Sequence, residues 1–259
     1  MDRARRCHRI QGHLPRVQLP TRQRTMRLAV LAFVHGPDES LIAPWRAMVE
    51  RTYPGCKIIL ANDGCCTGDI ETIPNTWAIG APRAVRDSLQ RLARDFSADW
   101  IIKTDVDVAH LKSDWLNPSE TAGKYVIGFQ QTRQFPWGFK GGAYAIKRRF
   151  LPLMVNAFDC PTCPCHAAKD EDCAMSLAAY IADPLAIHLH RHDPLGRGLY
   201  ADWNPNGCKD ANLYARRFNV VHCGTMGDRE QTLELMQNFE SITRGKSLDI
   251  AASIPTRTA

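Results

Sequence analysis

Two aspartates, Asp105 and Asp107, end an apolar run in the middle of the chain and could hold a metal ion. The run from Trp100 to Val108 is rich in β-forming residues and predicts a strand, whose period of two places both carboxylates on one face. Two like charges this close repel, and burying them without a partner would be costly. Unless they are simply solvated at a strand end, they need a hard cation such as Mg²⁺ or Mn²⁺, which prefer carboxylate oxygens.

Three consecutive acids, Asp170-Glu171-Asp172, stand at the start of a segment whose apolar residues recur at helical spacing up to Pro184. They predict a helix with acids in its first turn. Negative charge at that end of a helix interacts favourably with the helix dipole. Dipole stabilisation alone would therefore account for these acids.

His222 follows the short apolar stretch from Phe218 to Val221, so we expect it at the end of a further strand. Imidazole is a common metal ligand that Mn²⁺ accepts more readily than Mg²⁺ does. His188, His190 and His192 alternate along another possible strand and share one face. We interpret them as a polar strand face, because no acidic partner is fixed among them.

Four potential soft ligands lie within seven residues: Cys160, Cys163, Cys165 and His166. They could hold a structural Zn²⁺, but the second Cys-x-x-Cys half that is typical of such sites is missing. The other cysteines are scattered without a repeating spacing. Since no secretory signal is seen, we expect reduced thiols and a cytoplasmic location.

Two apolar runs of strand length precede the Asp-x-Asp segment and must help to position it. The first spans Leu28 to Val34 and is followed by a turn and a predicted helix that Pro54-Gly55 stops. The second, Lys57 to Ala61, ends in the polar residues Asn62-Asp63-Gly64. Continuous apolar runs are typical of buried strands in a parallel sheet. These successive strand and helix units point their carboxyl ends at one place.

The strand before Asn62-Asp63-Gly64, a predicted helix with Val85-Arg86-Asp87 and the strand ending in Asp105-Val106-Asp107 resemble the donor half of GT-A-fold glycosyltransferases. The resemblance spans about residues 26 to 110. It implies that Asp105 and Asp107 hold a divalent ion, which grips the diphosphate of a nucleotide sugar. It also implies that Asp63 contacts the nucleotide and that Arg86 is a nucleotide or phosphate contact.

The resemblance extends downstream. Gly141-Gly142 is similar to a glycine pair that GT-A enzymes place beside the donor sugar, although a β-bulge would also explain it. Glu171-Asp172 matches an acidic pair at a helix start that faces the acceptor. This implies that Asp172, or else Glu171, is the catalytic base that removes the proton of the acceptor hydroxyl. His222 matches a C-terminal histidine that binds the same ion.

Length and charge fit one globular domain with loose ends. The 259 residues are 44% apolar, and residues 1–25 hold seven Arg and one Asp, which leaves 26 basic and 26 acidic residues in the remainder. We expect a disordered basic tail at 1–25, a single domain at 26–245 and a loose end at 246–259. The neutral body argues against nucleic-acid binding, and no apolar run reaches the length of a transmembrane segment.

These observations predict an α/β fold: a single GT-A-like, Rossmann-like domain with a mostly parallel central sheet flanked by helices. The predicted function is a metal-dependent glycosyltransferase of the hexosyltransferase class. It would use Mn²⁺ or Mg²⁺ and a nucleotide diphosphate sugar, with a glycan, lipid or protein hydroxyl as acceptor. Two alternatives stay open: a nucleotidyltransferase of related fold, and a non-catalytic zinc- or carbohydrate-binding protein.

Overall fold

The computed structural model describes residues 26–62, 68–71, 81–117, 119, 121–131, 138–162, 165, 170–191, 199–204, 210–224 and 228–245. Some of the predictions above fall outside these residues. They are the basic tail at 1–25, the loose end at 246–259, the nucleotide contact Asp63, the possible zinc ligands Cys163 and His166, and His192 of the predicted polar strand face. The domain boundaries that we place at 25/26 and 245/246 stay predictions.

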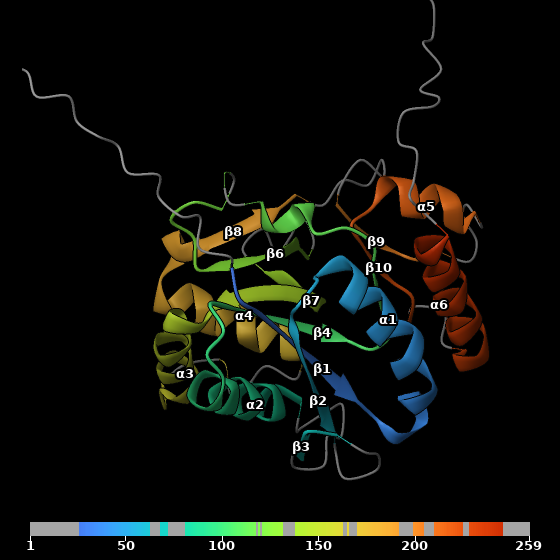
Figure 1. Ribbon diagram of the computed structural model, residues 1–259. Coiled ribbons are helices and arrows are strands. Elements are labelled where there is room, and N and C mark those ends of the chain that lie inside the picture. The colour runs from blue at the N-terminus through green and yellow to red at the C-terminus, as the bar shows by residue number, and fades with distance from the viewer. Residues whose placement is uncertain are drawn as a thin grey trace, which may run out of the picture.

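A seven-stranded sheet with the strand order β3-β2-β1-β4-β7-β6-β8 forms the centre of the described chain (Figure 1). Its strands are β1 (Leu28–Val34), β2 (Lys57–Asn62), β3 (Ile70–Glu71), β4 (Trp100–Asp105), β6 (Val126–Gln130), β7 (Phe139–Lys147) and β8 (Ile187–His190). Strand β7 runs antiparallel to its two neighbours, and every other pairing in the sheet is parallel. The predicted α/β fold with a mostly parallel central sheet is confirmed.

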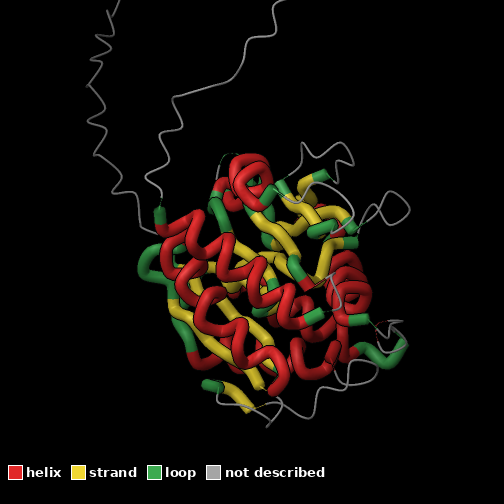
Figure 2. Tube along the Cα trace, turned by 90° about the vertical axis from the view of Figure 1, so that its right-hand side faces the viewer, coloured by secondary structure: helices red, strands yellow, loops and turns green. Residues whose placement is uncertain are grey.

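Helices cover both faces of this sheet, and Figure 2 shows helices lying over the strands. One face carries α1 (Ile42–Thr52) and α6 (Arg229–Arg244), and the other carries α2 (Ala81–Asp95), α3 (Leu151–Asp159) and α4 (Glu171–Ala182). Helix α5 (Ala211–Arg217) packs against α6. Short 3-10 helices lie at η1 (Gly36–Leu41), η2 (Asp114–Leu116), η3 (Arg148–Phe150) and η5 (Pro184–Ala186). None of the described helices combines the length and apolarity that crossing a bilayer requires.

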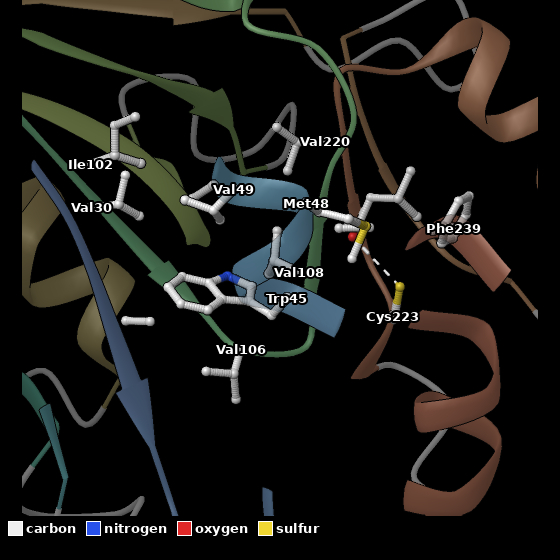
Figure 3. Close-up of a cluster of buried hydrophobic side chains, with 14 of the residues drawn as sticks. Val30, Trp45, Met48, Val49, Ile102, Val106, Val108, Val220, Cys223 and Phe239 are labelled. Carbon is white, nitrogen blue, oxygen red and sulfur yellow. Dashed lines mark hydrogen bonds between the residues drawn. The ribbon is translucent and has the colours of Figure 1, made fainter. Parts of the chain in front are cut away.

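Strand β1 shows why the apolar runs are continuous. Val30, Ala32 and Val34 belong to the hydrophobic core on the α1 face, while Ala29, Leu31 and Phe33 belong to the core on the opposite face. A strand that is covered on both sides needs apolar residues at every position, rather than at alternate ones. In Figure 3, Trp45 and Val49 of α1 lie among the side chains of the hydrophobic core on the α1 face.

A second, three-stranded sheet extends the α1 side of the molecule, with the strand order β5-β10-β9. It contains β5 (Val108–His110), β9 (Tyr200–Asp202) and β10 (Val220–His222). Only Val106 and Asp107 separate β4 from β5, so the prediction of a single strand from Trp100 to Val108 is wrong. Asp105 ends β4, and Asp107 lies in the turn where the chain passes from one sheet to the other, so the two carboxylates do not share one face of a strand. The register pairs His222 with Val108 on one side and with Asp202 on the other.

Buried polar side chains form a hydrogen-bonded chain beneath the end of β4. Trp115 Nε1 donates to Tyr53 OH over 2.9 Å, and this hydroxyl lies 3.0 Å from His110 Nδ1. His110 Nε2 lies 3.0 Å from Thr104 Oγ1, which donates to Gly142 O at 3.0 Å. Because Thr104 Oγ1 uses its one hydrogen on a carbonyl oxygen, it accepts from Nε2–H, and Nδ1 of the neutral ring then accepts from the tyrosine hydroxyl. Burial lowers the pKa of His110 to about 3, so the ring is neutral.

This buried histidine should make the fold sensitive to acid. Below about pH 6.5 an unfolded chain protonates His110 while the native chain does not, so its contribution to the free energy of unfolding falls as pH decreases towards 3. When the pH is lowered from 7 to 5, the free energy of unfolding, measured in urea, should fall by about 2 kcal/mol more for the parent than for His110→Gln. The comparison cancels the carboxylates common to both proteins. An equal pH dependence in the two would contradict the prediction.

Candidate functional site

A cavity of about 330 Å³ opens where β1 and β4 end, between the small sheet and the start of α4. This volume is in the range of small-molecule sites, and the carboxyl ends of strands are the usual ligand position in open α/β sheets. The structure brings most of the predicted site residues together there. The predicted residues that line the cavity are Asp105, Asp107, Gly141, Gly142, Glu171, Asp172 and His222.

Other predicted residues lie elsewhere. The guanidinium of Arg86 donates to Asp87 and Asp159, and Arg86 is not among the residues that line the cavity. This placement gives no support to a contact between Arg86 and a donor. His188 and His190 lie on β8 with ring centroids 4.8 Å apart, also away from the cavity.

The cysteine cluster is only partly described. Cys165 is buried, and Cys160 Sγ lies 3.2 Å from Thr162 Oγ1. The zinc site stays a prediction, since two of its four possible ligands lie outside the described residues.

Asp107 and His222 lie next to each other in the wall of the cavity. His222 Nε2 lies 3.4 Å from Asp107 Oδ2, while Asp107 Oδ1 is buried and has no hydrogen-bond partner among the described residues. A buried carboxylate oxygen without a partner is unfavourable, and a cation would satisfy it. The donor set therefore fits a divalent ion. Among the described residues, however, ligand atoms within 4.8 Å of one another are found only for Asp170, Asp172 and Cys173, so Asp105, Asp107 and His222 are more widely spread.

Asp202 orients His222 from the other side, and the sequence analysis missed it. His222 Nδ1 lies 3.3 Å from Asp202 Oδ1, and Asp202 also accepts hydrogen bonds from Lys140 and Tyr200. Burial opposes protonation of His222, but Asp107 and Asp202 outweigh it and raise its pKa to about 10. A carboxylate behind a histidine is a common arrangement in metal sites, where it fixes the ring and its tautomer. Only the pairing of β9 with β10 reveals this contact.

Gly224 leaves the space that the Asp107 carboxylate occupies. A Cβ at this position would lie 1.8 Å from Asp107 Oδ2 and 3.3 Å from His222 Nε2. The carboxylate would then have to turn away from the imidazole. Gly224 is therefore a supporting residue of the candidate ion site.

Gly224→Ala should weaken Mn²⁺-dependent binding of a nucleotide diphosphate by at least about tenfold, since the displaced carboxylate belongs to the candidate ion site. The fold should survive, because only a side chain at a cavity has to move. Isothermal titration and a melting curve would measure the two effects. Gly245→Ala is the matched control, because its Cβ would meet its nearest atom at an ordinary 3.5 Å. Equal affinities of Gly224→Ala and the parent would exclude this role.

Asp105 and Glu171 share a buried ammonium that the sequence analysis also missed. Lys103 Nζ lies 2.9 Å from Asp105 Oδ1 and 2.8 Å from Glu171 Oε2. The other oxygen of Glu171 accepts a hydrogen bond of 2.6 Å from Tyr144 OH. Burial raises the pKa of Glu171, against the lowering effect of Lys103. Both oxygens of Glu171 are thus engaged within the protein.

Asp172 lines the same cavity with a different set of partners. Its Oδ2 accepts from Gln131 Nε2 at 2.7 Å and its Oδ1 from the amide of Cys173 at 2.9 Å. Burial raises the pKa of Asp172. A carboxylate with a raised pKa at a cavity wall is a stronger proton acceptor than an ordinary one.

The glycine pair allows a close approach of protein groups. A Cβ on Gly141 would lie 2.9 Å from Glu171 Oε2, and a Cβ on Gly142 would lie 3.0 Å from Tyr200 OH. The register of β6 with β7 is irregular between the pairs Gly128–Tyr144 and Gln130–Phe139, so Gly141 and Gly142 lie within this irregular segment of β7 and the alternative of a β-bulge stays open. At Gly141 and Gly142, the absence of side chains lets β7 pass close to α4 and β9.

No protein family model matches the chain, and no curated protein resembles it closely enough to count as a relative. Among solved structures, the fold is similar to that of a glycosyltransferase involved in the glycosylation of the major capsid of PBCV-1. The TM-score is 0.52 at 17% identity, over 82% of this chain and 99% of that one. It is also similar to the glycosyltransferase GlyE of Streptococcus pneumoniae TIGR4, with a TM-score of 0.50 at 12% identity, over 86% of this chain and 63% of that one. The chain therefore has a glycosyltransferase-like fold of the predicted GT-A type.

Proposed function

We propose that this protein transfers a sugar from a nucleotide diphosphate sugar to an acceptor hydroxyl, using a divalent ion held by Asp105, Asp107 and His222. The observation that carries the proposal is the buried Oδ1 of Asp107, which has no hydrogen-bond partner in the described part of the chain, while Oδ2 of the same carboxylate lies beside His222. The fold adds support, because both similar structures named above are glycosyltransferases. Mn²⁺ suits a donor set of two carboxylates and an imidazole better than Mg²⁺ does.

The charge of the cavity also supports a metal-dependent donor. Carboxylates line it in excess over cationic side chains, which are Lys103, Lys140 and, before an ion displaces its proton, His222 with its raised pKa. A diphosphate would be repelled by this surface unless a cation lay between them. The cavity-lining carboxylates are Asp38, Asp105, Asp107, Asp170, Glu171, Asp172 and Asp202.

Different parts of the cavity wall suit different parts of the donor. Phe33, Ala81 and Val85 form an apolar part of the wall, which could contact a nucleoside. A bound divalent ion would screen the diphosphate and stabilise the charge that grows on the leaving nucleotide. Gly141 and Gly142 would lie beside the donor sugar.

Asp172 is our candidate for the catalytic base. It would accept the proton of the acceptor hydroxyl as that oxygen attacks the anomeric carbon. Glu171, with both oxygens already held by Lys103 and Tyr144, is the second candidate.

A thermal-shift panel tests the proposal. Nucleotide diphosphates and nucleotide sugars are added with and without Mn²⁺, and a ligand at 100 times its dissociation constant should stabilise the fold by about 2.7 kcal/mol. Stabilisation by a nucleotide diphosphate should require the ion, whereas Mn²⁺ alone and the nucleoside alone serve as controls. If no nucleotide shifts the melting temperature with or without Mn²⁺, the proposal fails.

A further inference from the structure

We propose that Lys103 is a positioning residue that joins the ion-binding end of β4 to the start of α4 and to the backbone of β7. The inference rests on the proposed function. Lys103 Nζ donates to Asp105 Oδ1 at 2.9 Å, to Glu171 Oε2 at 2.8 Å and to Gly141 O at 2.9 Å. An ammonium group has three N–H donors, so all of them are used. Lys103 therefore has no donor left for a substrate and acts through its three partners.

The surroundings of this ammonium are built to hold a charge. The Lys103 side chain is only 3% exposed, and a buried ammonium is strongly unfavourable unless it is paired. The rings of Phe33 and Tyr144 lie 5.9 and 5.8 Å from Nζ, within the range of cation–π attraction.

Glu171 is held from two neighbouring strands. Lys103 on β4 is paired in register with Tyr144 on β7, and side chains of such a pair lie on the same face of the sheet. The lysine reaches one oxygen of Glu171 and the tyrosine hydroxyl reaches the other. This pair fixes the direction of the Glu171 carboxylate, and with it the first turn of α4.

Gly141 completes the arrangement. A Cβ at this position would lie 2.9 Å from Glu171 Oε2 and 3.1 Å from Asp172 Cβ, so its absence lets α4 approach β7. Asp172, the candidate base, follows Glu171 directly in the chain. Loss of Lys103 would therefore free the ion-binding carboxylate and the acidic start of α4 at the same time. A displacement of about 1 Å in an active site can cost about 10²-fold in rate.

The first test needs no ligand and uses a double-mutant cycle read as melting temperature. Lys103→Met keeps an unbranched side chain but leaves Asp105 and Glu171 unpaired, so it should melt lower than the parent. Glu171→Gln should lower the melting temperature of the parent but raise that of Lys103→Met, because it then removes an unpaired charge. Asp202→Asn is the control, and it should change the melting temperature by the same amount in the parent and in Lys103→Met. If Glu171→Gln has the same effect in both backgrounds, the inference is overturned.

The second test separates positioning from ion binding. Binding of Mn²⁺ alone is followed by electron paramagnetic resonance. Lys103→Met should bind it at least as tightly as the parent, because the variant lacks the positive charge of the lysine beside Asp105. Hydrolysis of a nucleotide sugar, measured as released nucleoside diphosphate, should fall by at least about 10²-fold at saturating donor. Hydrolysis within about threefold of the parent rate would overturn the inference.

A milder variant covers the case in which Lys103→Met does not fold. Tyr144→Phe keeps every charge and removes only the phenol donor to Glu171, so Mn²⁺ affinity should be unchanged while hydrolysis falls about tenfold. Unchanged hydrolysis would again overturn the inference. If the parent protein binds neither Mn²⁺ nor any nucleotide, the proposed function is wrong, but this result does not test the role of Lys103. The melting cycle would still decide whether Lys103 joins these elements.

Discussion

Asp107→Asn is expected to abolish metal-dependent binding of nucleotide diphosphates while the protein stays folded. The change removes a charged ligand whose buried Oδ1 has no partner in the described protein. It retains the backbone contact in which the amide of Cys223 donates to Asp107 O at 2.8 Å. Affinity for a nucleotide diphosphate with Mn²⁺ should therefore fall by at least about 10²-fold, since even indirect supports of metal sites are worth about 10- to 100-fold.

The melting temperature without metal should change little in this variant, because two effects oppose each other. Burial, and in addition the charge of Asp107, raise the pKa of Asp105 against the lowering effect of Lys103, so neutralising Asp107 relieves repulsion. The same change takes a charged partner from His222 Nε2. Asp114→Asn, at an exposed acid in η2, is the matched control and should leave nucleotide affinity unaltered. If the metal-dependent affinity is unchanged in Asp107→Asn, the Asp-x-Asp segment only ends a strand and does not hold an ion.

The second large effect is expected for Asp172→Asn. An asparagine can keep the hydrogen bond from the amide of Cys173 with its oxygen, and its NH2 group can donate to Gln131 once the Gln131 amide rotates, so the local structure should persist. It cannot accept a proton. Turnover should therefore fall by about 10² or more, while donor and Mn²⁺ affinities stay near those of the parent, as is common when a general base is removed.

Asp170→Asn is the matched control for this prediction. It removes one negative charge from the same end of α4, so it reports the loss of helix-dipole stabilisation without loss of the base. Its effect on turnover should be far smaller than that of Asp172→Asn. Burial raises the pKa of Asp172, so turnover of the parent should also decline in acid, at a pH above the ordinary titration of an aspartate. Turnover of Asp172→Asn within a few-fold of the parent would shift the role of base to Glu171.

Arg86 shows that a pattern can predict a helix without predicting the direction of a side chain on it. The helical spacing of Val85, Leu89 and Leu92 predicts α2, and these residues are buried as expected. The direction of an arginine on the other face depends on which acids the folded chain places nearby. In the structure these are Asp87 and Asp159, and Asp159 is 73 residues further along the chain.

The sequence by itself predicted β1, β2 and β4, their parallel arrangement and the Asp-x-Asp segment that begins at the end of β4. These features depend on the order of apolar residues within a few positions, because a strand buried on both faces must be apolar throughout. Only the tertiary structure decided that Lys103 joins Asp105 to Glu171 and that Asp202 lies behind His222. Those contacts join residues 68 and 20 positions apart. They exist because α4 packs against β7, which neighbours β4, and because β9 pairs with β10 in the observed register. No local pattern of residues specifies that packing or that register.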